Sequence, residues 1–192
     1  GRGLETLAQL RRHASVAITD ATGLGGAAMS RYQTQMDSPI GPLTLISDGA
    51  SLFGVSMAGP QRLSTTADRM AAEDDVLAET RRQLTEYFAG TRTTFDVPLA
   101  GPGTAFPQTV WAALCGIAFG CTESYGGLAS RIGSPTASRA VGMANGRNPI
   151  VIIVPCHRVI GANGRLTGYA GGLERKQWLL AHEARIAGLR LS

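Results

Sequence analysis

Short apolar runs separated by turn-forming residues dominate residues 31–58. Three runs are rich in β-forming residues, namely Arg31–Met36, Leu43–Ser47 and Leu52–Met57. A Pro- and Gly-containing break at residues 38–42 and the pair Asp48-Gly49 separate them. Short runs joined by such turns are typical of an antiparallel meander. The pattern therefore predicts antiparallel strands in this region.

The spacing of apolar residues becomes helical after these strands. The recurring positions are Val76, Leu77, Leu84, Tyr87 and Phe88. Gly90 is a stop signal, so we expect a helix over residues 65–89 and a Pro- and Gly-containing linker over residues 91–103. Residues 31–100 are then predicted to form a small α/β domain. An extension over residues 1–30 precedes it, with disorder as one interpretation.

Residues 104–192 predict a mostly helical domain. Its first helix has an apolar face of Val110, Trp111, Leu114 and Ile117 and ends near Gly120. A last helix is expected over about Leu173–Ile186, and the aliphatic run Ile150–Val154 leads into Pro155-Cys156-His157-Arg158. The expected fold class is therefore α/β (α+β), with an antiparallel sheet in the first domain and helices in the second.

Two short helices are expected between residues 124 and 146. Ser124 suits the N-cap of the first helix, and Gly133 suits its end. Ser134 suits the cap of the second helix, with Pro135 in its first turn. This arrangement fits a helix-turn-helix, but a plain αα-hairpin fits the pattern as well.

Charge is distributed unevenly along the chain, whose formal net charge is +4. Residues 1–103 carry nine Arg and eleven Asp or Glu, a balance of −2, whereas residues 104–192 carry nine Lys or Arg and three Glu, a balance of +6. A basic half fits a polyanionic partner, although an ordinary solvated surface is an equal alternative. Because no apolar run approaches the about 20 residues of a membrane helix, no membrane partner is expected.

The cysteines Cys115, Cys121 and Cys156 are expected to be reduced thiols in the cytosol, since their number is odd and no secretion signal is recognisable. No CxxC pair occurs, and no histidine is near Cys115 or Cys121, so we expect no metal site. Cys115 falls within an apolar helical pattern and is predicted to be structural.

Cys156-His157 is the first candidate for chemistry, because a thiolate is a nucleophile that a nearby base can activate. Neighbours on a regular strand point to opposite faces, so this pair can cooperate only on irregular backbone, which Pro155 favours. A buried structural cysteine is the alternative.

Glu183 is the candidate third group. It falls among apolar positions of the last helix, where a carboxylate needs a partner. His157 would complete a Cys–His–Glu relay. A salt bridge to an arginine such as Arg158 is equally consistent with the spacing.

These residues belong to a longer pattern that covers about residues 31–187. Its landmarks are Ser38-Pro39-Ile40-Gly41, Tyr87-Phe88-Ala89-Gly90, Ser124-Tyr125, Arg139-Ala140-Val141-Gly142, Asn148-Pro149, Pro155–Ile160, Gly168-Tyr169 with Gly171-Gly172-Leu173, and Trp178-Leu179-Leu180 with His182-Glu183. Together they resemble the O6-alkylguanine-DNA alkyltransferases (methylated-DNA–protein-cysteine methyltransferases).

The resemblance implies DNA repair by irreversible, stoichiometric transfer of an alkyl group from O6-alkylguanine to Cys156, without a cofactor. His157 would act as a water-mediated base, with Glu183 as its carboxylate partner. Asn148 would brace the active-site turn. Tyr125 would aid nucleotide flipping and donate a proton toward guanine N3.

The resemblance also implies a DNA-binding surface and a substrate pocket. Arg139 would fill the space that the flipped nucleotide vacates, and Tyr125, Ser134 and Ser138 would contact DNA. The pocket would be lined by Tyr169, Val159 and Pro155.

The implied partner is double-stranded DNA that carries O6-alkylguanine, with O4-alkylthymine as a candidate second substrate. A bacterial-type, cytoplasmic, monomeric protein that associates with the nucleoid while acting is expected. Ala118, Cys121 and Glu123 differ from residues that are frequent in the family, and they lie close to Tyr125 in the sequence.

Three other classes of protein fit part of the pattern. A lesion-binding relative without transfer would have another residue in place of Cys156. A Cys–His hydrolase would need an oxyanion hole and no Arg139, and a plain helix-turn-helix regulator would not need the Pro155–Arg158 motif. Turnover distinguishes them, because a hydrolase turns over and a suicide acceptor stops at one equivalent.

Overall fold

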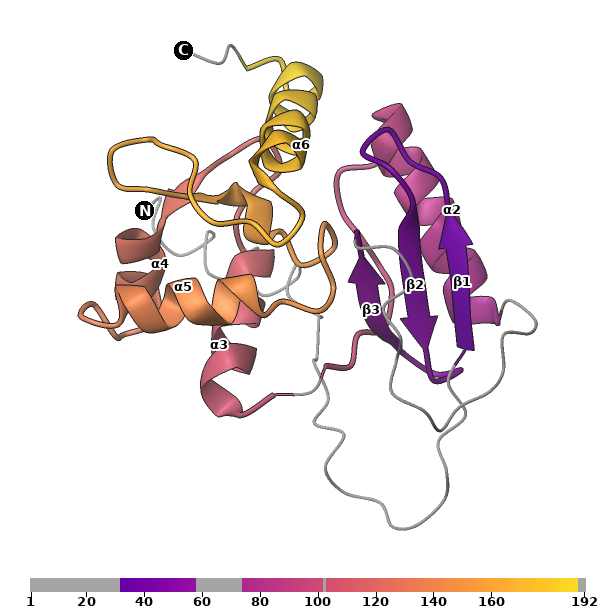
Figure 1. Cartoon of the computed structure of the whole chain (residues 1–192), viewed down its shortest axis with the longest axis horizontal. Coiled ribbons are helices and arrows are strands. Elements are labelled where there is room, and N and C mark those ends of the chain that lie inside the picture. The colour runs from indigo at the N-terminus through magenta and orange to yellow at the C-terminus, as the bar shows by residue number, and fades with distance from the viewer. Residues whose placement is uncertain (1–31, 58–73, 102, 190–192) are drawn as a thin grey trace, which may run out of the picture.

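The computed structural model describes residues 32–57, 74–101 and 103–189. It places a small sheet with one helix beside a group of helices (Figure 1), which confirms the expected α+β fold class. The proposed extension over residues 1–30 lies outside the described residues. Within those residues, no helix is both long enough and apolar enough to span a lipid bilayer.

The sheet is an antiparallel meander, as predicted. Strands β1 (Tyr32–Met36), β2 (Leu43–Ser47) and β3 (Leu52–Ser56) pair in the order β1-β2-β3. Within it Leu43, Leu45 and Val55 are buried, so the apolar face of the sheet forms part of the core.

Helix α2 (Asp75–Ala89) packs on this sheet, but it begins later than the sequence pattern predicts. Asp74 has extended backbone, and its carboxylate accepts a hydrogen bond from the amide of Leu77 at 2.7 Å. An N-cap of this kind fixes the helix start, so the prediction of one continuous helix from residue 65 is wrong. Residues 65–73 themselves lie outside the described residues. The helix ends at Gly90, whose φ of 80° favours glycine.

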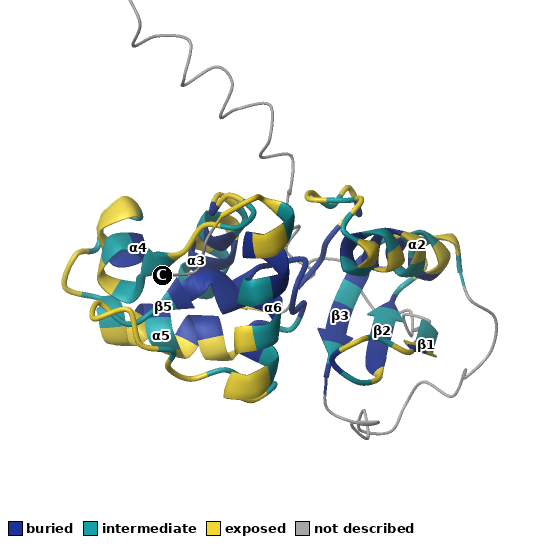
Figure 2. Ribbon diagram, turned by 90° about the horizontal axis from the view of Figure 1, so that it is seen from above, coloured by how far each residue is buried: buried dark blue, intermediate teal, exposed yellow. Residues whose placement is uncertain are grey.

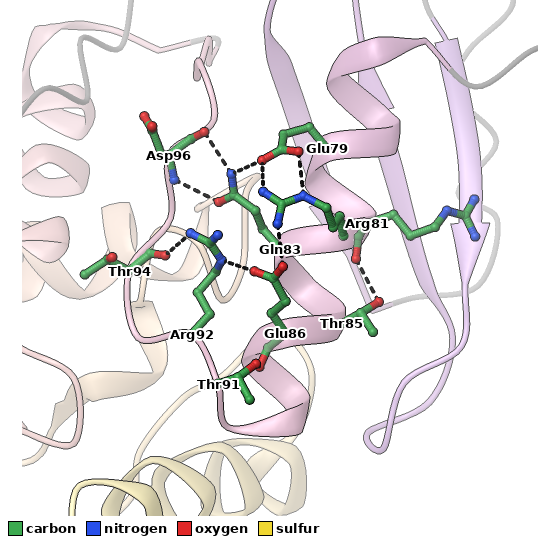
Figure 3. A network of polar contacts seen from close by, with 10 residues as sticks. Glu79, Arg81, Gln83, Thr85, Glu86, Thr91, Arg92, Thr94 and Asp96 are labelled. Carbon is green, nitrogen blue, oxygen red and sulfur yellow. Dashed lines mark hydrogen bonds and ion pairs between the residues drawn. The ribbon is translucent and has the colours of Figure 1, made fainter.

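The segment after α2, predicted as a linker, is held against that helix by polar contacts (Figure 3). Gln83 donates to the carbonyl of Asp96 at 2.9 Å and accepts from the amide of Asp96 at 2.8 Å. Arg92 bonds Glu86 at 2.6 Å. The segment then pairs with β3, since the amide of Leu52 donates to the carbonyl of Pro98 at 2.8 Å. These contacts fix the C-terminal end of α2 relative to the sheet.

The second half contains α3 (Ala105–Cys115), α4 (Tyr125–Arg131), α5 (Ser138–Gly146) and α6 (Leu173–Ile186), the last with its predicted bounds. Two short strands, β4 (Glu123–Ser124) and β5 (Val159–Ile160), pair in parallel. Ser124 caps α4, as expected, with its hydroxyl accepting from the amide of Gly127 at 3.0 Å.

The second helix of the pair begins later than expected. Ser134 does not cap it and Pro135 does not lie in its first turn, because α5 starts at Ser138. The carbonyl of Ser134 instead accepts from the amide of Ala137 at 2.9 Å, which forms a further turn between the helices. A backbone hydrogen bond within this turn therefore determines where α5 begins, and the capping preferences of single residues do not predict it.

The aliphatic run Ile150–Val154 joins the two halves. The amide of Val55 in β3 donates to the carbonyl of Pro149 at 2.9 Å, and the amide of Val151 donates back to Val55 at 3.2 Å. The run then folds into a tight turn, in which Ile152 has a φ of 74°. All five residues are buried between the halves (Figure 2).

Candidate active site

Cys156 begins a single turn of 3-10 helix, η1 (Cys156–Arg158), which confirms the expected irregular backbone. Asn148 braces the turn before it: its amide nitrogen donates to the carbonyl of Val154 at 2.7 Å, and its amide oxygen accepts from the backbone of Ile150 at 3.0 Å. Both Asn148 and Cys156 are buried, so these bonds determine where the thiol lies.

His157 and Glu183 are in direct contact, as the relay hypothesis requires. His157 Nε2 lies 2.8 Å from Glu183 Oε1, and both side chains are fully buried. Arg158 also pairs with the carboxylate, through Nε at 2.9 Å from Oε2 and Nη2 at 3.0 Å from Oε1. The two partners that the sequence left as alternatives are thus both present.

The carboxylate of Glu183 has two further donors. The hydroxyl of Tyr87 donates to Oε1 at 2.8 Å, and the backbone amide of Gly120 donates to Oε2 at 3.1 Å. Burial alone would raise the pKa of Glu183, but hydrogen bonds and charge from His157 and Arg158 outweigh it and lower that pKa. Glu183 is therefore ionised, and the buried charge of Arg158 balances it.

His157 is neutral in this setting, because burial lowers its pKa more than Glu183 raises it. An ionised carboxylate only accepts, so Nε2 carries the proton and Nδ1 has a free lone pair. Nδ1 is buried and has no hydrogen-bond partner among the described residues. Such a nitrogen can take a proton from a nearby thiol.

Cys156 is 3% exposed, and burial raises the pKa of its thiol to about 11. A hydrogen bond from Asn148 and the charge of Lys176 act in the opposite direction. Lys176 is itself fully buried and donates to the carbonyls of Val159 at 2.6 Å and Thr167 at 2.8 Å. The thiol is thus protonated near neutral pH and needs a base to react.

The residues proposed to line the pocket have different environments. Pro155 and Val159 flank η1 and are buried. Tyr169 is partly buried, its hydroxyl has no partner among the described residues, and burial followed by the charge of Cys156 raises its pKa.

The residues proposed to contact DNA gather on the helix pair. Tyr125 is the first residue of α4, and its ring lies against Gly142 of α5, where an added Cβ would be 3.7 Å from Cε1. Arg139 is exposed at the second position of α5, Ser138 precedes it, and Ser134 lies in the turn between the helices. The pairing of β4 with β5 ties the start of α4 to the segment that follows Cys156.

The sequence did not identify Tyr87, Lys176 or Gly120 as site residues. The sequence presents Tyr87 as an apolar helix position and as part of the landmark Tyr87-Phe88-Ala89-Gly90, and neither observation gives it a role in the site. A backbone amide such as that of Gly120 leaves no side-chain signal. Lys176 comes before the apolar positions of α6, and no motif around it distinguishes it from a surface lysine. Of the other thiols, Cys115 is partly buried and Cys121 is exposed. No group of His, Cys, Asp and Glu within the described ranges is arranged to hold a metal ion.

Comparison with known proteins gives consistent results. The family model "6-O-methylguanine DNA methyltransferase, DNA binding domain" matches residues 105–185, and the model of the ribonuclease-like domain of the same methyltransferase matches residues 31–100. A methylated-DNA–protein-cysteine methyltransferase of Methanosarcina acetivorans is 50% identical over 79% of this chain and 97% of its own. One of Mycobacterium tuberculosis is 53% identical over 81% of this chain and 93% of its own.

Solved structures agree with these sequence matches. A crystal structure of Mycobacterium tuberculosis OGT in complex with DNA aligns with a TM-score of 0.73 at 51% identity, covering 81% of this chain and 94% of that one. A crystal structure of the M. tuberculosis O6-methylguanine methyltransferase aligns with a TM-score of 0.71 at 50% identity, covering 81% and 93%. The chain therefore belongs to the methylated-DNA–protein-cysteine methyltransferase family.

Proposed function

We propose that this protein repairs DNA by moving the alkyl group of O6-alkylguanine onto Cys156, once per molecule. The observation that supports this most directly is the residue order in η1, where a buried thiol is followed by a neutral histidine that Glu183 orients. Family membership supports the same reaction class. The transfer is a methyltransferase reaction that leaves a thioether and no free enzyme.

In the proposed reaction, His157 accepts the thiol proton at Nδ1, directly or through one water. The sulfur of Cys156 then attacks the alkyl carbon, so an S–C bond forms as the bond from that carbon to guanine O6 breaks. Guanine leaves more easily if it gains a proton, and Tyr125 is the proposed donor toward N3. His157 then releases its proton to solvent and Tyr125 regains one from solvent, so that overall the thiol exchanges its proton for the alkyl group of guanine.

The proposed DNA surface is the α4–α5 pair. Flipping a nucleotide costs a few kcal/mol of unstacking, and an exposed side chain that enters the gap offsets part of that cost. Arg139 is suited to this role because it is exposed and lies near the start of α5. Ser134 and Ser138 would contact the DNA backbone beside it.

Tyr169, Val159 and Pro155 would line the pocket for the flipped base, and Asn148 would hold the turn that carries Cys156. We also propose a domain division at residues 31–100 and 104–192 with an extension over residues 1–30. The protein would act as a cytoplasmic monomer on double-stranded DNA, associated with the nucleoid while acting. O4-alkylthymine would be a second substrate.

Intact-protein mass spectrometry after mixing with a duplex that holds one O6-methylguanine tests the proposal. We expect a gain of one methyl group that maps to Cys156 and saturates at one per protein. Cys156→Ala should bind the duplex and gain nothing. Cys121→Ser, which removes an exposed thiol, should gain the methyl group as the wild type does.

The other outcomes correspond to the rival classes. No mass gain with tight duplex binding would indicate a lesion-binding module. Repeated turnover of substrate would indicate a hydrolase. Methylation that persists in Cys156→Ala would show that another residue is the acceptor.

A further inference from the structure

Tyr87 reaches the relay from the opposite half of the molecule. It lies near the C-terminal end of α2, 96 positions before Glu183, and its side chain is fully buried. Its hydroxyl is 2.8 Å from Glu183 Oε1, the same oxygen that His157 Nε2 contacts at 2.8 Å. One carboxylate oxygen therefore joins a tyrosine of the first half to the base of the second.

We propose that Tyr87 is a positioning residue for the transfer reaction: its hydroxyl fixes the carboxylate of Glu183 and limits how strongly that carboxylate holds the proton of His157. This inference rests on the proposed function. Tyr87 touches neither the thiol nor the alkyl group, and it acts only through Glu183 and His157.

Tyr87 is held firmly enough to serve this purpose. Its backbone carbonyl accepts a hydrogen bond from His182 Nε2 at 2.9 Å, so consecutive residues of α6 bind the hydroxyl and the backbone carbonyl of Tyr87. Its ring contacts those of Phe95 at 5.5 Å and Phe119 at 6.0 Å between centroids. A ring packed in this way cannot turn its hydroxyl away from Glu183 without displacing its neighbours.

The hydroxyl also changes the electrostatics of the relay. Glu183 Oε1 accepts from Tyr87, His157 and Arg158, and each donor withdraws negative charge from it. Removing one donor leaves more charge facing His157, which stabilises the protonated imidazole and raises the pKa of His157. It also frees the carboxylate to shift, which misaligns the base.

A Tyr87→Phe substitution removes one hydroxyl and no other ionisable group of the relay. Besides Glu183, the charged groups that act on His157 are Arg158 and Lys176, and both lower its pKa. A change in the titration of His157 in a Tyr87→Phe variant would thus report the lost hydroxyl.

The test compares full-length wild type, Tyr87→Phe and Phe95→Leu in single-turnover transfer from an O6-methylguanine duplex at pH 5–9. Transfer needs neutral His157, so its rate falls as pH drops through the pKa of that residue. In Tyr87→Phe we expect the plateau rate to fall by about tenfold, since a hydrogen bond to a charged group is lost. We also expect the acid limb to move to higher pH by about half a unit.

Phe95→Leu is the matched control, because it loosens packing against Tyr87 without removing a polar atom. It should lower thermal stability and leave the midpoint of the acid limb unchanged. If Tyr87→Phe keeps the wild-type rate and midpoint, or behaves as Phe95→Leu does, the proposed positioning role is wrong.

Nitrogen-15 NMR of the histidine rings gives a readout that does not depend on transfer. The signal of His157 is assigned by its loss in His157→Gln, and its titration midpoint should rise in Tyr87→Phe. An unchanged midpoint would overturn the inference. A wild type that transfers no methyl group would instead contradict the proposed function, while the NMR comparison would still report the effect of Tyr87 on the relay.

Discussion

At the scale of single residues, the protonation state of His157 determines what the site can do. The ion pair of Glu183 with Arg158 satisfies the carboxylate without a second cation, and burial lowers the pKa of His157. A neutral imidazole that donates through Nε2 to Glu183 has its base at Nδ1. The ion pair of Glu183 with Arg158 thus helps His157 to act as a base, because it leaves the imidazole uncharged.

His157→Gln should lower the transfer rate at pH 7 by about a hundredfold or more, because general-base assistance is lost. The thiol pKa of about 11 then controls the reaction, so the rate of this variant should rise about tenfold per pH unit toward pH 10. The wild type should be nearly flat from pH 7 to pH 9. Single-turnover rates across this range provide the measurement, and a His157→Gln rate that does not change with pH would contradict the assignment of the base.

At the scale of elements, the active-site turn and the α4–α5 pair are joined by short, specific contacts. The pairing of β4 with β5 links the start of α4 to the end of η1, and the indole of Trp111 in α3 donates to the carbonyl of Ala144 in α5 at 2.9 Å. These contacts hold the exposed face of α5, including Arg139, in a fixed relation to Cys156.

Arg139→Ala should slow transfer from a duplex by about tenfold, because filling the vacated stack offsets an unstacking cost of a few kcal/mol. Transfer from a single-stranded oligonucleotide, where little stacking is lost, should change much less. Arg147→Ala is a control with the same charge change at an exposed position next to α5. It should weaken binding to both substrates in a salt-dependent manner. If Arg139→Ala and the wild type transfer from the duplex at equal rates, Arg139 does not fill the space that the flipped nucleotide leaves.

At the scale of the whole molecule, the two halves form one unit around the active site. Besides the contacts of Val55 and Tyr87, Arg175 of α6 donates to the carbonyl of Ile40 at 2.8 Å and to that of Met57 at 3.4 Å. It also donates to the carbonyl of Gly171 at 3.3 Å, in the loop that follows Tyr169. Arg175 therefore ties this loop of the proposed pocket to the sheet.

Replacing Arg175 with Met should lower the free energy of unfolding by about 1–3 kcal/mol, since three partly buried carbonyls lose a donor. Amide hydrogen exchange should become faster in the turn at residues 38–41 and in the loop at residues 168–172. Arg165→Met, at an exposed position, should change neither quantity. If amide hydrogen exchange in both segments is the same in Arg175→Met as in the wild type, the contacts of Arg175 do not hold the loop.

The sequence by itself determined most of the elements and the candidate chemistry. Strand alternation, helical spacing and the cap at Ser124 depend on neighbours along the chain, so β1–β3 and α6 were predicted close to their bounds. The Cys156-His157 pair and its irregular backbone could be expected for the same reason, because Pro155 acts locally. The individual catalytic and DNA-binding roles stay predictions.

Only the tertiary structure decided which distant groups meet. The carboxylate of Glu183 accepts hydrogen bonds from both His157 and Arg158. It also accepts one from the hydroxyl of Tyr87, 96 positions earlier, because α6 packs against the end of α2. The later starts of α2 and α5, by contrast, follow from local hydrogen bonds, the Asp74 cap and a turn at Ser134, which the apolar spacing alone did not reveal. Sequence patterns reflect the preferences of neighbouring residues. The partners in a buried polar network depend instead on which distant residues the packing brings within hydrogen-bond distance.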